Sequence, residues 1–246
     1  MDTNLTGRKA LVTGGARGIG ASIARTLAAR GADVVITYSA SSEAAEKVVS
    51  EIRATGRQAY AVKADAGDKG EARQGVRDAV EHLGGLDIVV NNAGNGWFES
   101  FMDASDEHIE STLDVNIGGV LYTTHEALKY LGEGGRVISI GSVVAEHAPF
   151  AGLTVIATAK AALVGFTKAL ARDLGGRGVT VNVVQPGPID PDGVRATGEM
   201  ASLSAPTSLG RFGTAEEVAE LVAWVASDAA SFVTGTALTV DGGWTA

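Results

Sequence analysis

Several residue types are missing or scarce in this chain of 246 residues, and each shortage excludes a class of protein. There is no cysteine, so disulfide bonds and thiolate metal sites are excluded, and no metal site is predicted. Lys and Arg total 20 against 29 Asp and Glu, which gives a formal charge of −9. Such an acidic balance argues against nucleic acid or an anionic membrane as a partner. We therefore expect a small-molecule ligand.

Targeting signals are also missing from the sequence. The first residues, MDTNLTGRKALVTGG, lack a basic segment followed by an apolar one, which is the pattern of a secretory leader. No apolar run is expected to reach membrane-spanning length. These features predict a cytoplasmic protein.

Proline is scarce, and its distribution is uneven. Four of the five prolines fall within residues 185–213, QPGPIDPDGVRATGEMASLSAPTSLGRFG. A long irregular segment after a parallel strand is usually a lid or a substrate loop. We expect such a lid at about residues 186–212.

The rest of the chain alternates short apolar runs with amphipathic helical stretches. The apolar runs are nearly continuous, as expected for strands that are covered on both faces. Seven such strands are predicted, at residues 9–13, 33–38, 58–64, 86–91, 136–140, 179–184 and 237–240. The pattern predicts a single α/β domain over residues 1–246, with a doubly wound, mainly parallel seven-stranded sheet of the Rossmann type.

A glycine-rich turn follows the first strand and leads directly into a helix. Its sequence is TGGARGIG, residues 13–20. Gly14, Gly18 and Gly20 permit a tight turn and a close approach of the backbone to a pyrophosphate, which would lie at the positive end of the helix. Because the motif lies between a strand and a helix, it favours a dinucleotide site over a turn used only for packing.

The end of the second strand bears on the choice between NAD and NADP. An NAD site usually has an acidic residue there to bind the ribose 2′-hydroxyl. This chain has the neutral Tyr38 and Ser39, and Arg17 of the glycine-rich turn can supply a positive charge. The combination favours NADP(H), although Arg17 could equally be an ordinary solvated arginine.

Seven short motifs make the chain resemble the short-chain dehydrogenase/reductases, and within them the 3-oxoacyl-carrier-protein-reductase-like branch. The motifs occur in the family's order over nearly the whole length. They are TGGARGIG (13–20), NNAG (91–94), VN (115–116), IGS (140–142), the lysine of IATAK (156–160), PG (186–187) and TGTALTVDGG (234–243).

The resemblance implies a set of cofactor-binding residues. Asp65 and Ala66 would contact the adenine, Lys160 the nicotinamide ribose, and Ile189 the carboxamide. The complete implied set is Gly14, Arg17, Gly18, Ile19, Gly20, Tyr38, Ser39, Asp65, Ala66, Asn91, Ala93, Gly94, Lys160, Pro186, Gly187 and Ile189. The family's usual assembly further implies a homo-tetramer or a dimer.

The resemblance also implies the catalytic residues. Asn116 would kink its helix and hold a water of the proton relay, and Ser142 would bind the substrate oxygen. Lys160 would lower the pKa of a catalytic tyrosine four residues earlier. At that position this chain has Ile156.

Ile156 and Lys160 are one helical turn apart, so both side chains are expected on the same helix face. Hydride addition to a ketone leaves a basic alkoxide, and a positioned acid that quenches it accelerates the reaction by about 10²–10⁴-fold. Isoleucine has no proton to donate. The sequence therefore predicts an atypical active site.

Three interpretations of Ile156 remain open. In the first, the protein is an NADPH-dependent reductase of an iminium or carbinolamine, which needs no acid at the hydride step. In the second, it is a ketone reductase in which another acid, such as His147, replaces the phenol. In the third, it is a catalytically inactive NADPH-binding scaffold, although the presence of Asn116, Ser142 and Lys160 argues against this.

A few residues are candidates for the substrate site. Trp97, Phe98 and Phe150 could form an apolar platform for a ring-bearing natural product, or could simply pack beneath a loop. Asp190 or Asp192 could stabilise a cationic substrate, or could only form a turn in PIDPDG.

Overall fold

The seven predicted strands form one parallel sheet in the computed structural model, which describes residues 3–190 and 207–246. The strands lie in the order β3-β2-β1-β4-β5-β6-β9, and every neighbouring pair is parallel. Their bounds are β1 Lys9–Val12, β2 Asp33–Tyr38, β3 Ala59–Lys63, β4 Ile88–Asn91, β5 Arg136–Ile140, β6 Thr180–Pro186 and β9 Ala237–Val240. This arrangement confirms the predicted doubly wound fold.

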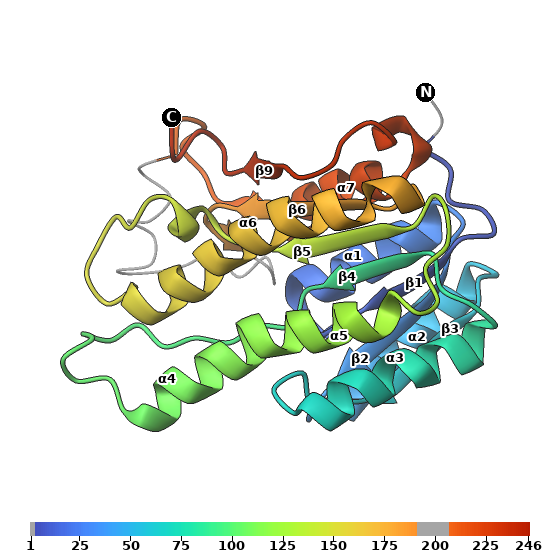
Figure 1. Ribbon diagram of the computed structural model, residues 1–246, viewed down its shortest axis with the longest axis horizontal. Helices are drawn as coiled ribbons and strands as arrows, with labels where there is room; N and C mark the ends of the chain where they lie inside the picture. Colours follow the sequence, from blue (N-terminus) through green and yellow to red (C-terminus); the bar gives the residue numbers. More distant parts are fainter. Residues whose placement is uncertain (1–2, 191–206) are drawn as a thin grey trace.

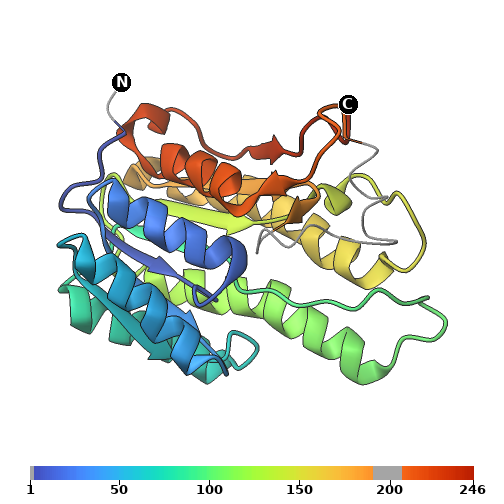
Figure 2. The same cartoon turned by 180° about the vertical axis from the view of Figure 1, so that it is seen from behind.

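Helices cover both faces of the sheet (Figures 1 and 2). Figure 2 shows α1, α2 and α7 on one face, and Figure 1 shows α3, α5 and α6 on the other, with α4 leading into α5. The bounds are α1 Gly18–Ala29, α2 Ser42–Ala54, α3 Lys69–Leu83, α4 Asp106–Leu113, α5 Gly119–Ala127, α6 Thr154–Leu174 and α7 Ala215–Ala226. Each face has its own apolar core, which is why the strands read as unbroken apolar runs.

The start of α7 is fixed by two residues close together in the sequence, Thr214 and Glu217. Thr214 caps the helix: its hydroxyl accepts a hydrogen bond from the backbone N–H of Glu217, and the Glu217 carboxylate accepts one from the N–H of Thr214. This reciprocal pair is a capping box. A two-stranded parallel ladder of β7 (Ile189–Asp190) and β8 (Gly213–Thr214) lies beside it and joins the two ends of the expected lid.

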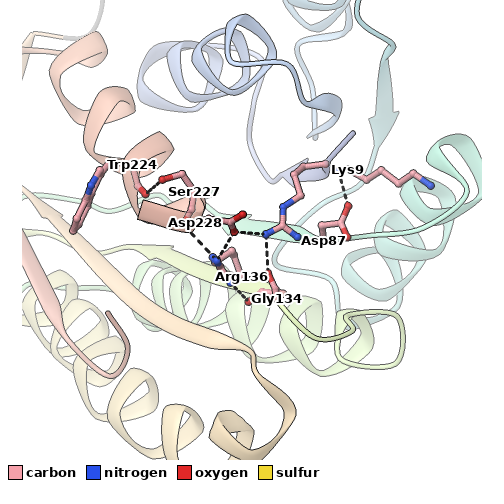
Figure 3. A network of polar contacts seen from close by, with 9 residues as sticks. Lys9, Asp87, Gly134, Arg136, Trp224, Ser227 and Asp228 are labelled. Carbon is pink, nitrogen blue, oxygen red and sulfur yellow. Dashed lines mark hydrogen bonds and ion pairs between the residues drawn. The ribbon is translucent and has the colours of Figure 1, made fainter. Parts of the chain in front are cut away.

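The amino end of the sheet is closed by a polar network around Arg136, the first residue of β5 (Figure 3). Its guanidinium is buried and donates to the Gly134 carbonyl at 2.7 Å and to the Asp228 carboxylate at 3.2 Å. Arg8 donates to the same two residues. Burial, followed by the nearby charge of Arg8, holds the pKa of Arg136 below its ordinary value. The network lies at the opposite end of the strands from the glycine-rich turn.

The expectation that no apolar run reaches membrane-spanning length is wrong. Residues Thr154–Arg177, which comprise α6 and the turn after it, are long and apolar enough to span a membrane by length and composition. The helix packs along β6 on one face of the sheet (Figure 1), so its apolar character belongs at least in part to the fold. Only 22% of its most apolar window is buried within the chain.

The loop of residues 186–212 is described only at its two ends. Pro186, Gly187 and Asp190 lie within the described part of the chain, whereas Asp192 and the middle of the expected lid lie outside it.

Candidate active site

A cleft of about 570 Å³ opens at the carboxyl ends of β1 to β4. This is where the chain crosses from β3 at one edge back to β4 beside β1, and such a switch point is the usual ligand site of a parallel α/β sheet. The cleft is lined by Gly14, Ala16, Arg17, Gly18, Ile19, Gly20, Tyr38, Ser39, Ala40, Ser41, Ala64, Asp65, Ala66, Asn92, Ala93, Gly94, Asn95, Ser111 and Val115.

The glycine-rich turn is held against β4 by close backbone contacts. Gly14 has a φ of +64°, and a β-carbon there would lie 2.9 Å from the Cα of Ala93. A β-carbon at Gly20 would lie 2.4 Å from the Asn92 amide nitrogen, which donates to the carbonyls of Thr13 and Gly14. Larger residues at either position would push the turn out of place.

Helix α1 starts at this turn without a side-chain cap. Arg17 occupies the N-cap position, and its side chain makes no capping hydrogen bond. The backbone N–H groups at a helix start carry a partial positive charge and are suited to binding phosphate oxygens. The turn therefore has the geometry of a dinucleotide cradle.

At the far end of the cleft, the residues after β2 are neutral. Tyr38, Ser39 and Ser41 line this end together with the exposed Arg17. Asp65, after β3, is the one acidic residue among those that line the cleft. One cation beside hydroxyl groups fits a 2′-phosphate better than a 2′-hydroxyl, which an acidic residue would bind.

Among the expected cofactor residues around NNAG, Asn91 lies outside the cleft. It is 3% exposed, and its side-chain amide donates to the Thr124 hydroxyl of α5. Side chains alternate between the two faces of a strand. Asn91 therefore faces α5, and the next residue, Asn92, lines the cleft instead. Asn92 and Asn95 were missed by sequence reasoning, although NNAGN, residues 91–95, contains both.

The catalytic end of the site begins at a kink between α4 and α5. Residues Asp114–Gly118 form a π-helical turn that contains Asn116, and such turns often occur at functional sites. The Asn116 amide nitrogen donates to the carbonyls of Asn95 and Thr112. Its side-chain oxygen, Oδ1, is buried and has no partner among the described residues.

Lys160 of α6 lies beside this oxygen. Its ammonium donates to the carbonyl of Ile140, at the end of β5, at 3.0 Å. A β-carbon at Gly94 would lie 2.9 Å from Asn116 Oδ1 and 3.5 Å from Lys160 Nζ, so the two groups flank one point. Burial lowers the pKa of Lys160 from 10.5 to about 8, because desolvation disfavours the charged ammonium.

Ile156 lies one turn before Lys160, and its side chain faces the loop after β4. A β-carbon at Gly96 would lie 3.2 Å from the Ile156 Cδ1 and 3.4 Å from its Cγ1. The Ile156 side chain is half-buried. It forms an apolar wall at the position where a phenol would otherwise stand.

The four tyrosines of the chain all lie in its described part, away from Ile156. Tyr38 lines the far end of the cleft. Tyr60 stacks on His82 at the other edge of the sheet, and Tyr122 lies beneath Lys69 and Arg73. Tyr130 follows the end of α5. No phenol from another segment of this chain therefore replaces the missing one.

Ser142 is half-buried after β5, whereas His147 lies on the exposed part of the following loop. The Ser142 hydroxyl accepts a hydrogen bond from the N–H of Val144, which leaves its own proton for a ligand. His147 is exposed, and its ring lies edge-on to the indole of Trp244 at 5.9 Å.

The aromatic candidates divide into two pairs. Trp97 stacks on His108 of α4 with ring centroids 4.3 Å apart, so it is already partnered. Phe98 and Phe150, from two different loops, have centroids 6.5 Å apart, and both are exposed. The loops are joined by a hydrogen bond from the N–H of Glu99 to the Gly152 carbonyl. The structure thus brings together Phe98 and Phe150, whereas Trp97 packs its loop against α4.

The remaining predicted residues follow β6. Gly187 is required by a close approach, because a β-carbon there would lie 2.5 Å from the Cβ of Asp241. Pro186 ends β6, whereas Ile189 and Asp190 form β7. None of these four residues lines the cleft described above.

Comparisons with known proteins agree with this geometry. Residues 14–245 match the protein family described as Enoyl-(Acyl carrier protein) reductase. A short-chain dehydrogenase from Burkholderia cenocepacia, whose crystal structure was solved in complex with NADP, is 48% identical. It superposes with a TM-score of 0.96 and covers 99% of this chain and 100% of its own.

Two curated relatives have more specific names. The cyclic-di-GMP-binding biofilm dispersal mediator protein of Escherichia coli is 43% identical over 96% of this chain and 97% of its own. Versicolorin reductase of Emericella nidulans is 40% identical over 97% of this chain and 96% of its own.

Proposed function

Because this chain belongs to the short-chain dehydrogenase/reductase family, we propose that it is an NADPH-dependent reductase of activated C=N substrates. The acceptor is an iminium ion, formed from a carbinolamine, in a small ring-bearing molecule. The observation that carries this proposal is the apolar Ile156 at the reacting position, with every tyrosine of the chain elsewhere.

The described residues fit NADP(H). The uncapped start of α1 suits the pyrophosphate, and Arg17 with Ser39 and Ser41 suits a 2′-phosphate. The related dehydrogenase of Burkholderia cenocepacia binds the same cofactor. When bound, NADPH supplies a hydride. Lys160 would hold the nicotinamide ribose, and Pro186, Gly187 and Ile189 would border the nicotinamide.

The chemistry of the acceptor explains why isoleucine is tolerated. A ketone that accepts hydride becomes an alkoxide and needs a nearby acid. An iminium ion already carries a positive charge, and hydride neutralises it to an amine, so no alkoxide has to be protonated. Ile156 then acts as a wall that excludes water from the cation. Ser142, with a hydroxyl proton to donate, binds the polar end of the substrate.

Transfer of deuterium tests this function directly. The protein is incubated with NADPH deuterated at C4 and with two panels of substrates, simple ketones and preformed cyclic imines. We expect deuterium in amines only, found by mass spectrometry. Turnover of ketones alone would contradict the proposal and favour a carbonyl reductase with another acid, such as His147. No turnover of either panel despite NADPH binding would indicate a cofactor-binding scaffold.

We also propose that the protein is a homo-oligomer, a tetramer or a dimer, that buries α6 between subunits. The support is the exposure of this helix: its most apolar window has a mean hydropathy of 1.3 but is only 22% buried within one chain. An exposed apolar surface of this kind usually marks an interface. Light scattering after gel filtration tests the assembly, and a monomeric mass at micromolar concentration would contradict it.

A further inference from the structure

We propose that Lys160 is itself the proton donor of this enzyme, and that it protonates the hydroxyl that a carbinolamine loses when the iminium ion forms. The proposal rests on the function proposed above and deepens it. It gives Lys160 a task that does not pass through a tyrosine.

The position of Lys160 supports this task. Ile156 and Lys160 share one face of α6, and residues at this spacing have β-carbons about 5–6 Å apart. A molecule that packs against the Ile156 branch is therefore within reach of the ammonium, directly or through one water. Only one of the three ammonium protons has a partner, the Ile140 carbonyl at 3.0 Å, among the described residues.

A second polar atom near Lys160, Asn116 Oδ1, could help to hold a water that relays the proton. Asn116 Oδ1 is fully buried without a partner among the described residues, and a buried acceptor in that state is costly unless a donor reaches it. The point that a Gly94 β-carbon would take lies 2.9 Å from this oxygen and 3.5 Å from Lys160 Nζ. Because glycine puts no side chain between the two groups, a water bound between them could accept from Nζ, donate to Oδ1 and relay a proton to the substrate.

The groups around Nζ are neutral. They are the Ile140 carbonyl of β5, the Asn116 amide of the π-helical turn, the Gly94 backbone and the aliphatic Ile156 of α6. Asp65 lines both the cleft and a second pocket, in which Glu110 and Asp114 also lie.

The other titratable groups near the site are also accounted for. His147 contacts Trp244, and Asp190 lies in the β7–β8 ladder. Burial alone accounts for the lowered pKa of Lys160, about 8. An acid with a pKa near the working pH is present in its protonated form and still releases its proton readily.

The proposed step balances without the cofactor. The nitrogen lone pair of the carbinolamine forms the C=N bond while the C–O bond breaks, and the hydroxyl leaves as water with the proton from Lys160. The products are the iminium ion, water and a neutral Lys160 amine, which solvent later reprotonates. No electron is gained or lost.

Charge balance favours this donor over a phenol. The positive charge leaves Lys160 in the step that creates it on the substrate, so the buried site holds one cation before and after. If Lys160 stayed charged, the new iminium ion would form beside a second cation in surroundings of low dielectric, where like charges repel strongly.

Exchange of oxygen with solvent tests the donor without reduction. Reversible dehydration replaces the hydroxyl oxygen of a cyclic carbinolamine with ¹⁸O from labelled water. The cofactor site is filled with 1,4,5,6-tetrahydro-NADP, whose ring is neutral like that of NADPH but donates no hydride. We expect the wild-type protein to accelerate this exchange and Lys160→Met to slow it by roughly 100-fold. Lys47→Met, which alters an exposed lysine on α2, away from the site and from α6, should exchange like wild type.

Two further measurements separate proton donation from a structural effect. Exchange should fall as pH rises through about 8, because only the ammonium can donate its proton. Methylammonium should restore exchange to Lys160→Ala, whose binding of the neutral analogue and unfolding midpoint are measured as controls.

The outcomes distinguish the two proposals. Equal exchange by wild type and Lys160→Met, or a rate that does not change between pH 6 and 10, would overturn the donor alone. If wild type binds the neutral analogue but accelerates no exchange, both the donor and the C=N function fail.

Discussion

Ile156 replaces a proton donor by a hydrocarbon wall, and the consequence can be tested by restoring the donor. Ile156→Tyr would place a phenol one turn from Lys160, where the nearby ammonium lowers its pKa. We expect ketone reduction to rise by about 10²-fold, as measured by NADPH consumption with an aromatic ketone. Ile156→Phe is the matched control, because it adds the ring without the hydroxyl. Equal rates for the two variants would mean that something other than the acid limits ketone reduction.

We propose that the choice of NADP(H) over NAD(H) depends on Arg17. It is exposed at the end of the cleft beside neutral hydroxyl groups. Arg17→Gln should weaken NADPH binding by about 10- to 100-fold, since a hydrogen bond to a charged group contributes about 1.5–3 kcal/mol. NADH binding should change little. Fluorescence titration measures both constants, and an equal loss for the two cofactors would place Arg17 on the pyrophosphate instead.

At the scale of the element, the capping box of α7 links the carboxyl end of the expected lid to a helix of the core. Thr214→Ala removes the acceptor for the Glu217 N–H and should lower the free energy of unfolding by about 1 kcal/mol. Thr214→Ser retains the hydroxyl and should lose little. Urea denaturation measures both, and a Ser variant as unstable as the Ala variant would show that the methyl group, not the cap, matters.

The same capping box makes part of the stability depend on pH. Hydrogen bonds from Arg211 and from the Thr214 N–H lower the pKa of Glu217 from 4.5 to about 2. A carboxylate with a lowered folded-state pKa stabilises the fold above its unfolded pKa, and this stabilisation is lost as pH falls toward 2. Glu217→Gln should therefore lose less stability than wild type between pH 5 and pH 2. Because the side chain is partly exposed, the difference will be small, and parallel curves would contradict it.

The elements also show where sequence patterns stop being informative. The seven strands were predicted, because period and β-branched residues are local properties. The loop after β4 was not. Trp97 and Phe98 are adjacent in sequence, yet one stacks on α4 and the other reaches Phe150, because a loop without a regular period takes its side-chain directions from what it packs against.

On the scale of the whole molecule, function and stability occupy opposite ends of the sheet. The cleft opens at the carboxyl ends of the strands, whereas the Arg136 network ties the start of β5 to the segment after α7 at the amino ends. Arg136→Met should lower the free energy of unfolding by about 3 kcal/mol, because buried carbonyls and Asp228 lose their donor. Chemical denaturation measures this loss.

Arg8→Met is the matched control for this network, since Arg8 is more exposed and has fewer bonds to it. It should cost less, and neither variant should change the dissociation constant of NADPH. A change in NADPH binding by Arg136→Met would mean that the two ends of the sheet are coupled.

The sequence by itself determined the sheet, the glycine cradle and the pairing of Ile156 with Lys160 on one helix face, since each depends on residues within a few positions of one another. Only the tertiary structure decided that no tyrosine of the chain approaches Ile156, that Asn92 rather than Asn91 lines the cleft, and that Lys160 and Asn116 flank one point. These facts depend on distant segments packed together, and burial by those segments lowers the pKa of Lys160 to about 8.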